Sequence, residues 1–332
     1  MSNKNDPYTL IIGSSNMDLN IYSEKLPQQG ETVTGGIFKQ SLGGKGANQA
    51  VASVRSGANT KFIGKIGNDA IGEQMIAQLT AEGIDISRII TDPKNASGVA
   101  FILIDNNGEN IISVAPGANS KLSPAEIRKN TELIKNAGSV AVQMEIPIET
   151  ISEIFKIASE GSAVKILNPA PLRSIPLEII KNIDILVPNR GELFQLCSIL
   201  DLGELHGTVD EKIIDASEKI SNLGVGTIIT TLGPKGCILY QNNDNINGSI
   251  KFPAFKVNAV DTVGAGDCFI GVFTGKMCQQ MKIVDAVSYA ISAASISVTR
   301  KGAQTSMPYM DEIEVRFGEY RKTMKDGNKI KN

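Results

Sequence analysis

Short apolar runs and longer amphipathic stretches alternate along most of the chain. The apolar runs are rich in Ile, Val and Leu, as in "YTLIIG" (8–13), "TKFIGKIG" (60–67), "SVAVQMEI" (139–146), "AVKILNPA" (163–170), "DILVPN" (184–189) and "GTIITTLG" (226–233). The other stretches have apolar residues at helical spacing and end on Gly, as in 69–83, 123–138, 147–161 and 210–224. Buried strands alternating with amphipathic helices indicate a parallel sheet with helices on both faces. The pattern therefore predicts an α/β fold with a Rossmann-like central sheet.

Two segments, at about 17–41 and 97–116, depart from this alternation. The first alternates polar and apolar residues between Pro and Gly turns, and the second has two strand-like runs joined across "DNNGEN" (105–110), which is typical of a hairpin. We expect both to form a small antiparallel sheet, which is either a lid over a site or a β-extension without that role. The chain then consists of a single α/β domain at 7–320, including the lid, and a polar tail at 321–332.

Composition and charge exclude several classes of protein. The chain has 332 residues and a formal net charge of -2 with interleaved signs, so no basic face for nucleic acid is expected. No apolar run is long enough to cross a bilayer, and "MSNKNDPYTL" lacks the apolar middle of a signal peptide. The four cysteines include no CxxC pair, which favours reduced thiols over disulfides or zinc. We expect a cytoplasmic protein that binds neither nucleic acid nor membrane.

The single histidine restricts the possible chemistry. His206 lies in "DLGELHGTV", which has the composition of a surface loop. A solvated loop histidine is the simplest interpretation, so an enzyme with this sequence needs a carboxylate, lysine or cysteine as its general base.

The first of three Gly-rich stretches is "GGKGANQAVA" (43–52). Its glycines lead into a predicted helix, with Lys45 and Asn48 at the helix start. Glycine lets the backbone amides approach a polar ligand closely, and the Asn48 amide suits a hydroxyl group. A simple helix cap with a tight turn would have the same sequence, and this alternative stays open.

The second stretch, "GSSNMDLN" (13–20), follows the first predicted strand. Ligands of open α/β sheets bind beyond the carboxyl ends of the strands, where Asn16 and Asp18 are expected. An ionised Asp that accepts from two neighbouring hydroxyl groups would recognise a diol. The alternative is an Asx turn that leads into the lid.

The third stretch, "AVDTVGAGDCFIGVF" (259–273), places small residues before an acid and an apolar run. If "FKVNAV" (255–260) is a strand and the run from Asp267 a helix, the residues from Gly264 to Asp267 form a helix N-terminus. Free N–H groups and the helix dipole there would make an anion hole suited to phosphoryl transfer. Asp267 could also be only a capping acid, although a cap does not need three small residues before it.

These motifs together resemble those of the PfkB carbohydrate kinases. "DTVGAGD" (261–267) is similar to the second signature of that family and "GGKGANQAVA" to the first, whereas a Walker A loop and a GxGxxG motif are both missing. Further stretches resemble the ribokinase branch of the family: "QGETVTG" (29–35, where the family has "PGETVTG"), "LNPAP" (167–171), "TLGPKG" (231–236) and "VTRKGAQ" (298–304). The similarity runs in order from about residue 8 to residue 310.

The resemblance implies a ribokinase-like fold and the activity of an ATP:D-ribose 5-phosphotransferase. Asp267 would be the base that takes the proton of the ribose 5-hydroxyl, and the amides of Gly264, Ala265 and Gly266 would form the anion hole. The implied ribose site comprises Asn16, Asp18, Gly44, Lys45, Gly46, Asn48, Glu145 and Asp267. Glu145 would otherwise be only a surface acid at the end of a strand.

The resemblance also implies sites for ATP and cations. The ATP site would include Asn189, Thr231, Gly233, Gly236, Gly266 and Ile291, with Glu192 associated with Mg²⁺ and phosphate. Asn189 and Glu192 have the spacing of a capping box as well. A monovalent cation, usually K⁺, would be bound mainly by backbone carbonyls of Asp261, Val263, Ser297, Arg300, Gly302 and Ser306. Members of this group commonly form homodimers through the lid, and the two β insertions would do the same.

Two positions depart from the family pattern. Met17 stands where ribokinases often have a smaller residue, and Ile291 stands where some relatives have a polar residue near the adenine. A deoxyribokinase or another PfkB sugar or nucleoside kinase is therefore the nearest alternative. A non-catalytic sugar-binding regulator is a further alternative, although such a protein would be expected to lose Asp267 or its glycines.

Overall fold

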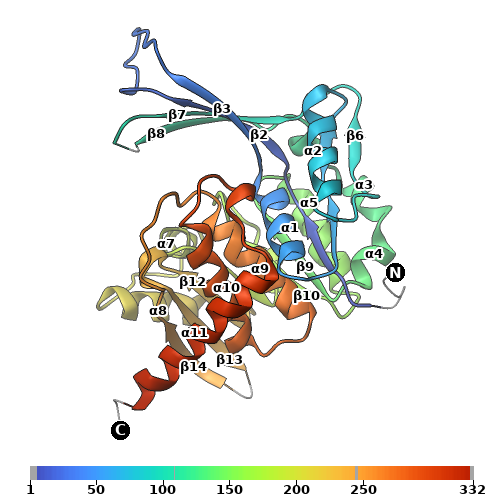
Figure 1. The fold of residues 1–332 in the computed structure, drawn as a ribbon. Coiled ribbons are helices and arrows are strands. Elements are labelled where there is room, and N and C mark those ends of the chain that lie inside the picture. The colour runs from blue at the N-terminus through green and yellow to red at the C-terminus, as the bar shows by residue number, and fades with distance from the viewer. Residues whose placement is uncertain (1–5, 108, 244–245, 330–332) are drawn as a thin grey trace.

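A computed structural model describes residues 6–107, 109–243 and 246–329. Its centre is an eight-stranded sheet in the order β14-β13-β12-β11-β10-β9-β1-β4 (Figure 1). The six parallel strands are β1 (Thr9–Ile12), β4 (Thr60–Ile63), β9 (Ser139–Gln143), β10 (Val164–Asn168), β11 (Ile185–Leu186) and β12 (Thr227–Thr231). An antiparallel hairpin of β13 (Cys237–Asn243) and β14 (Ile246–Phe252) extends one edge. The predicted fold class is confirmed.

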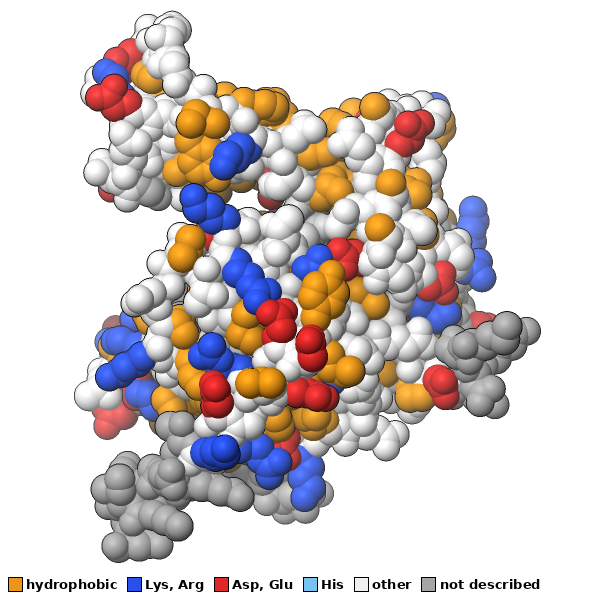
Figure 2. Space-filling view, in the orientation of Figure 1, with side chains coloured by type: hydrophobic (Ala, Val, Ile, Leu, Met, Phe, Trp, Pro, Cys, Tyr) orange, Lys and Arg blue, Asp and Glu red, His pale blue; other side chains and the backbone are white. Residues whose placement is uncertain are grey.

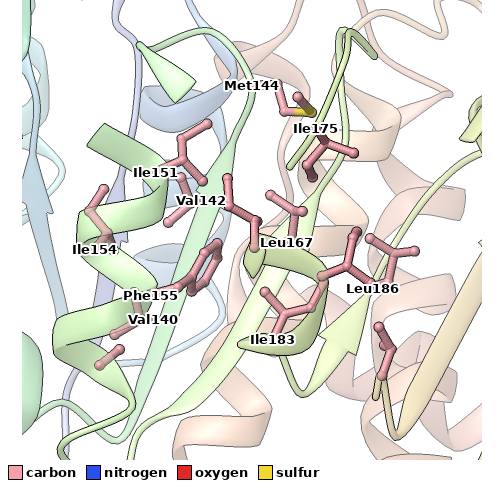
Figure 3. Close-up of a cluster of buried hydrophobic side chains, with 14 of the residues drawn as sticks. Val140, Val142, Met144, Ile151, Ile154, Phe155, Leu167, Ile175, Ile183 and Leu186 are labelled. Carbon is pink, nitrogen blue, oxygen red and sulfur yellow. The ribbon is translucent and has the colours of Figure 1, made fainter. Parts of the chain in front are cut away.

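The central strands are apolar throughout because both faces of the sheet are buried. Val140 and Val142 of β9 pack in one core cluster, together with Phe155 and Leu167 (Figure 3), whereas Ala141 belongs to the other. The first cluster receives side chains from α3 (Pro124–Arg128), α4 (Thr131–Lys135), α5 (Ile148–Ala158), α6 (Leu177–Lys181), α7 (Arg190–Ile199) and α8 (Val209–Ser221). The second receives them from α1 (Lys45–Arg55), α2 (Ala70–Ala81), α9 (Ala265–Cys278), α10 (Ile283–Ser297) and α11 (Met310–Lys329).

A separate four-stranded sheet projects from this body (Figure 1). Its strands are β3 (Ile37–Gly43), β2 (Asn16–Tyr22), β7 (Gly98–Ile104) and β8 (Asn110–Ala115), in that order. β2 pairs antiparallel with β3, and β7 with β8, but β2 and β7 are parallel. This sheet, the predicted lid, is therefore mixed, and the expectation of an antiparallel sheet holds only within each insertion. Met17 anchors its base by packing on Ile66 and Met75.

Three predicted elements differ in the structure. The stretch 60–67 forms two strands, β4 and β5 (Lys65–Gly67), and β5 pairs with β6 (Ile90–Asp92) in a small sheet of its own. The stretch 123–138 forms two short helices, α3 and α4, because the chain turns at 129–130. The expected strand at 255–260 is wrong: the segment has no ladder partner, and the Val260 amide donates to the Val298 carbonyl at 2.7 Å.

Helix α11 reaches Lys329, so most of the predicted polar tail is helical. Within the described residues, no helix is long and apolar enough to cross a membrane.

Candidate active site

Asp267 lies in the first turn of α9 and is only 7% exposed. Its carboxylate accepts hydrogen bonds from both sides: Asn48 Nδ2 donates to Oδ2 at 3.0 Å, and Gln49 Nε2 donates to Oδ1 at 3.1 Å. Both donors come from α1, which packs against α9. The first and third Gly-rich stretches, 43–52 and 259–273, are therefore joined by hydrogen bonds at this carboxylate.

Lys45, the first residue of α1, is surrounded by acidic side chains. The attraction of Asp267 is the largest effect on it and, with that of Glu145, Glu192 and Asp18, raises the pKa of the Lys45 ammonium above its ordinary value, although burial opposes this. Four carboxylates around one ammonium make the site acidic when all are ionised. A polyphosphate would therefore enter this site more readily with accompanying cations.

Asp18 lies on lid strand β2 with its carboxylate against Gly43 of β3. A Cβ atom at Gly43 would lie 2.2 Å from Asp18 Oδ2, so only glycine leaves room for the carboxylate there. Burial raises the pKa of Asp18 to about 7, and repulsion by Glu145 and Asp267 adds to the effect. The four-stranded sheet thus carries a carboxyl group that changes its charge near neutral pH.

Glu145 follows β9 and is held at the start of α1. Its Oε2 accepts from the Ser14 hydroxyl and from the Lys45 backbone N–H, the latter at 3.1 Å. Arg173 donates to the carbonyls of Met144 and Ile146 on either side of it. Glu145 is therefore an ordered part of the site and not a free surface acid.

Asn16 is oriented by a residue from outside the predicted motifs. Asn119 Nδ2 donates to Asn16 Oδ1 at 2.8 Å and to the Ser15 carbonyl at 3.0 Å. The loop also approaches α1 closely, because a Cβ at Gly44 (φ 85°) would lie 2.7 Å from the Asn16 nitrogen. At Gly46 it would lie 2.7 Å from the Ser14 nitrogen, so these glycines are required by packing.

A cavity of about 140 Å³ opens beside Asp267. It is lined by Lys45, Asn168, Ala170, Val187, Asn189, Glu192, Thr231, Gly264, Gly266, Asp267 and Ile270. The predicted base, two anion-hole glycines and three residues of the predicted ATP and phosphate site therefore share one cavity. A larger cavity of about 430 Å³ opens at the amino ends of β10, β11 and β12 and contains none of the predicted residues.

The N-terminus of α9 has the predicted form. Gly264 is the N-cap residue with φ 73°, a conformation that favours glycine, and the helix begins at Ala265. At Gly266 a Cβ would meet nothing within 4 Å, so the protein itself leaves that space open. The Ala265 amide differs from the prediction, because it donates to the Thr262 carbonyl at 3.2 Å and is not free for a ligand. The amide of Gly266 and the open space beside it fit a bound anion.

Asn189 and Glu192 form a complete capping box at the start of α7. Glu192 Oε2 accepts from the Asn189 backbone N–H at 2.8 Å, and Asn189 Oδ1 accepts from the Glu192 backbone N–H at 2.9 Å. Burial raises the pKa of Glu192. The capping interpretation is therefore confirmed, and both residues still line the cavity.

Other predicted ATP residues lie outside the cavity. Ile291 is buried in the core on α10. Gly233 and Gly236 form the turn between β12 and β13, where a Cβ at Gly236 would lie 1.9 Å from the Phe252 carbonyl oxygen. A packing role thus accounts for Gly236 without a ligand.

The two predicted cation segments lie side by side. Asp261 Oδ1 accepts from the Val263 amide at 3.0 Å, and Oδ2 accepts from the Gly302 amide at 2.9 Å. The Arg300 guanidinium is paired with Glu312. The hydroxyl groups of Ser297 and Ser306 donate to nearby carbonyls of Ala294 and Ala303.

Some residues of this region were not assigned a role from the sequence. Asn119 lies in a short 3-10 helix (Gly117–Lys121) and Gln143 on β9, both outside the Gly-rich stretches, and their contacts depend on how the strands are ordered in space. Ser14, Gln49 and Asn168 lie inside motifs quoted above, but no motif showed which residues they contact. His206 lies on an exposed loop between α7 and α8, as predicted.

The cysteines take no part in the site. All four are free and buried, and burial raises the pKa of the Cys268 thiol, next to Asp267, to about 12. Cys268 is therefore a core residue and not a nucleophile.

Comparisons with known proteins identify the fold and the family of this chain. The fold is the ribokinase-like α/β fold: the ribokinase of Arabidopsis thaliana, solved with ribose and ATP, matches with a TM-score of 0.85 and 30% identity over 94% of this chain and 99% of that one. The model of the pfkB family carbohydrate kinases matches residues 6–310. The chain belongs to the PfkB family of carbohydrate kinases.

Curated relatives include more than one activity. The ribokinase of Staphylococcus aureus (strain COL) is 36% identical over 94% of this chain and 99% of its own length. The deoxyribokinase of Salmonella typhimurium is 35% identical over 93% of this chain and 97% of its own length. The predicted family is confirmed, and the choice of sugar depends on the site.

Proposed function

We propose that the protein is a ribokinase, which transfers the γ-phosphoryl group of ATP to the 5-hydroxyl of D-ribose. The observation that carries the proposal is the buried Asp267 carboxylate, held by Asn48 and Gln49 beside the glycines of the α9 N-terminus. Ribose and ATP occur together in the related Arabidopsis ribokinase. The residues Asn16, Asp18, Glu145 and Asn48 offer several acceptors and donors to the hydroxyl groups of a sugar.

In this mechanism Asp267 accepts the proton of the ribose 5-hydroxyl as that oxygen attacks the γ-phosphorus. The bond between the γ-phosphorus and the β–γ bridging oxygen breaks, and ADP leaves with the electron pair. The amides of Gly264 and Gly266 stabilise the negative charge on the transferred group, and Lys45 adds a positive charge. The Ala265 amide would join them only by leaving the Thr262 carbonyl. The protein contributes mainly position and electrostatics.

The acidity of the site fits a role for cations. Within residues 6–107, 109–243 and 246–329, no three His, Cys, Asp or Glu side chains are arranged to hold a metal ion. Mg²⁺ would therefore be held chiefly by phosphate oxygens, with Glu192 nearby, and it would neutralise charge on the phosphates. K⁺ would be bound by backbone oxygens of the segments around Asp261 and 297–306, which hydrogen bonds bring together.

An ADP-release assay over pentoses, hexoses and nucleosides tests the proposed function. We expect D-ribose to have the highest kcat/KM and potassium to increase the rate. A site that hydrogen-bonds the 2-hydroxyl should reject 2-deoxyribose, because its polar groups would be left unpaired. Higher kcat/KM for 2-deoxyribose would assign the chain to the deoxyribokinases, and a preference for fructose or adenosine would refute a pentose kinase.

The pKa of Asp18 predicts a pH dependence of ribose binding. Its ionised form accepts from hydroxyl groups most strongly, and this form is lost as the pH falls below about 7. Because one pH unit below the pKa leaves about a tenth of the carboxylate charged, we expect KM for ribose to rise about tenfold between pH 8 and pH 6. Steady-state kinetics would measure this. The Asp18→Asn variant should bind ribose more weakly, with a KM that is higher than that of the wild type and does not change with pH. Parallel pH profiles in both proteins would contradict the role of Asp18.

We also propose that the lid mediates a homodimer. Its strands expose Ile37, Phe38, Phe101, Ile112 and Val114, each more than half exposed, and Figure 2 shows hydrophobic side chains gathered there. An apolar sheet of this kind favours pairing with a second copy. Sedimentation should show a dimer that Phe101→Glu converts to a monomer, whereas Val315→Glu, at an exposed position on α11, leaves it intact. A monomeric wild-type protein would contradict the proposal.

A further inference from the structure

Three buried amide side chains form a connected network behind the Asp267 carboxylate. Gln49 of α1 donates through Nε2 to Asp267 Oδ1 at 3.1 Å and to Asn168 Oδ1 at 3.3 Å. Gln143 of β9 donates through Nε2 to Gln49 Oε1 at 2.6 Å. Gln49 and Gln143 are both fully buried, and Asn168 of β10 is 5% exposed.

The ends of the network determine the direction of every hydrogen bond in it. An ionised Asp267 can only accept, so Gln49 must turn its N–H groups toward the carboxylate. Asn168 Nδ2 donates to the Val187 carbonyl at 3.1 Å, which also can only accept, so Asn168 presents its oxygen to Gln49. A reversed Gln49 amide would place its oxygen against two other oxygen atoms. Gln143 supplies the donor that the remaining Gln49 oxygen needs.

Stability of the fold alone does not account for Gln143. Its Oε1 has no hydrogen-bond partner in the described part of the chain and lies against Gly13, where a Cβ would be 2.0 Å away. A buried amide oxygen without a partner destabilises a fold, whereas a leucine of similar size would leave no unpaired atom. The amide is therefore better explained by its donation to Gln49.

We propose that Gln49, held in orientation by Gln143, is a positioning residue for the Asp267 base. The inference rests on the proposed function, in which Asp267 takes the proton of the substrate hydroxyl. The terminal torsion of an Asp side chain is soft, so a carboxylate without fixed donors would spend time misaligned. Asn48 holds one oxygen beside the predicted sugar site, and Gln49 holds the other from behind without lining the cavity. Proton transfer thus begins from one carboxylate orientation.

The test separates turnover from binding. In Gln49→Leu we expect kcat to fall about 10- to 100-fold, with KM for ribose and ATP within about threefold of wild type, because only alignment of the base is lost. Gln143→Leu should lower kcat by a smaller factor, and the double variant should match Gln49→Leu alone. A loss expressed in KM only, or an additive loss in the double variant, would overturn the inference.

Controls distinguish this inference from a general effect on folding. Gln241→Leu removes a similarly buried Gln, which donates to Thr227 Oγ1 at 3.3 Å at the amino end of β12, and should leave kcat unchanged. If Gln49→Leu does not fold in a thermal melt, Gln49→Met keeps the volume and serves the same test. A wild-type protein that does not release ADP with ribose refutes the proposed function, and an Asp267→Asn enzyme with wild-type turnover refutes the assignment of the base. An inactive Asp267→Asn with a fully active Gln49 variant refutes only the positioning role.

Discussion

Replacing Asp267 by Asn is expected to lower kcat by about 10²- to 10⁴-fold, the range that a general base contributes to a reaction. The carboxylate is buried, accepts two amide donors and lines the cavity with the helix-terminus glycines. Asn keeps the size and most of the packing of Asp but cannot take the proton of a hydroxyl group. ADP release under saturating ribose and ATP would measure the loss.

Binding must survive for this result to identify a base. Asn16 and Glu145 are held by hydrogen bonds that do not involve Asp267, and Asp18 lies on β2, so ribose should still bind to Asp267→Asn with an affinity within about tenfold of wild type. Calorimetric titration with ribose, together with a thermal melt, checks both the site and the fold. Near-wild-type turnover would refute the assignment of Asp267 as the base, whereas a wild-type protein that binds ribose without releasing ADP would favour a sugar-binding regulator.

The central sheet could be predicted because its physical cause is local. Strands such as 139–143 are buried on both faces, so their sequences are apolar throughout, and helices between them show helical spacing. The lid was harder to predict. Side chains alternate in the same way in parallel and antiparallel strands, so the sequence does not show that β2 pairs in parallel with β7, about eighty residues later. Segment 255–260 was misassigned because an apolar alternation does not ensure that a strand has a partner.

The same distinction applies to the site. Gly264, Gly266, Asp267, Lys45 and Asn48 were found because small residues before a helix and its first-turn side chains form a pattern within one short segment. Asn119 and Gln143 were missed, since each acts on a residue more than ninety positions away. Their contacts follow from the order of strands in the sheet and not from any local motif.

Gly266 provides a test of whether this helix terminus is built for a ligand or for the fold. A Cβ at Gly266 meets no protein atom within 4 Å, and its backbone conformation suits any residue, so the fold does not require glycine there. Gly266→Ala should therefore raise the free energy of unfolding by about 0.4–1 kcal/mol through the unfolded state. The new methyl group would occupy the open space beside the first-turn amides, where the transferred phosphoryl group is proposed to lie.

We expect Gly266→Ala to lower kcat/KM for ATP about 10²-fold, because a misplacement of about 1 Å at a reacting group costs this much. Gly318→Ala is the matched control. Gly318 is an exposed glycine within α11, and a Cβ atom at this position would also meet no protein atom within 4 Å. It should gain similar stability with unchanged kinetics. Denaturant unfolding and ADP-release kinetics on both variants measure the two effects separately. If Gly266→Ala is as active as Gly318→Ala, the open space at the α9 N-terminus does not hold the phosphoryl group. If Gly266→Ala is more stable than the wild type but inactive, glycine is needed at this position for the ligand and not for the fold.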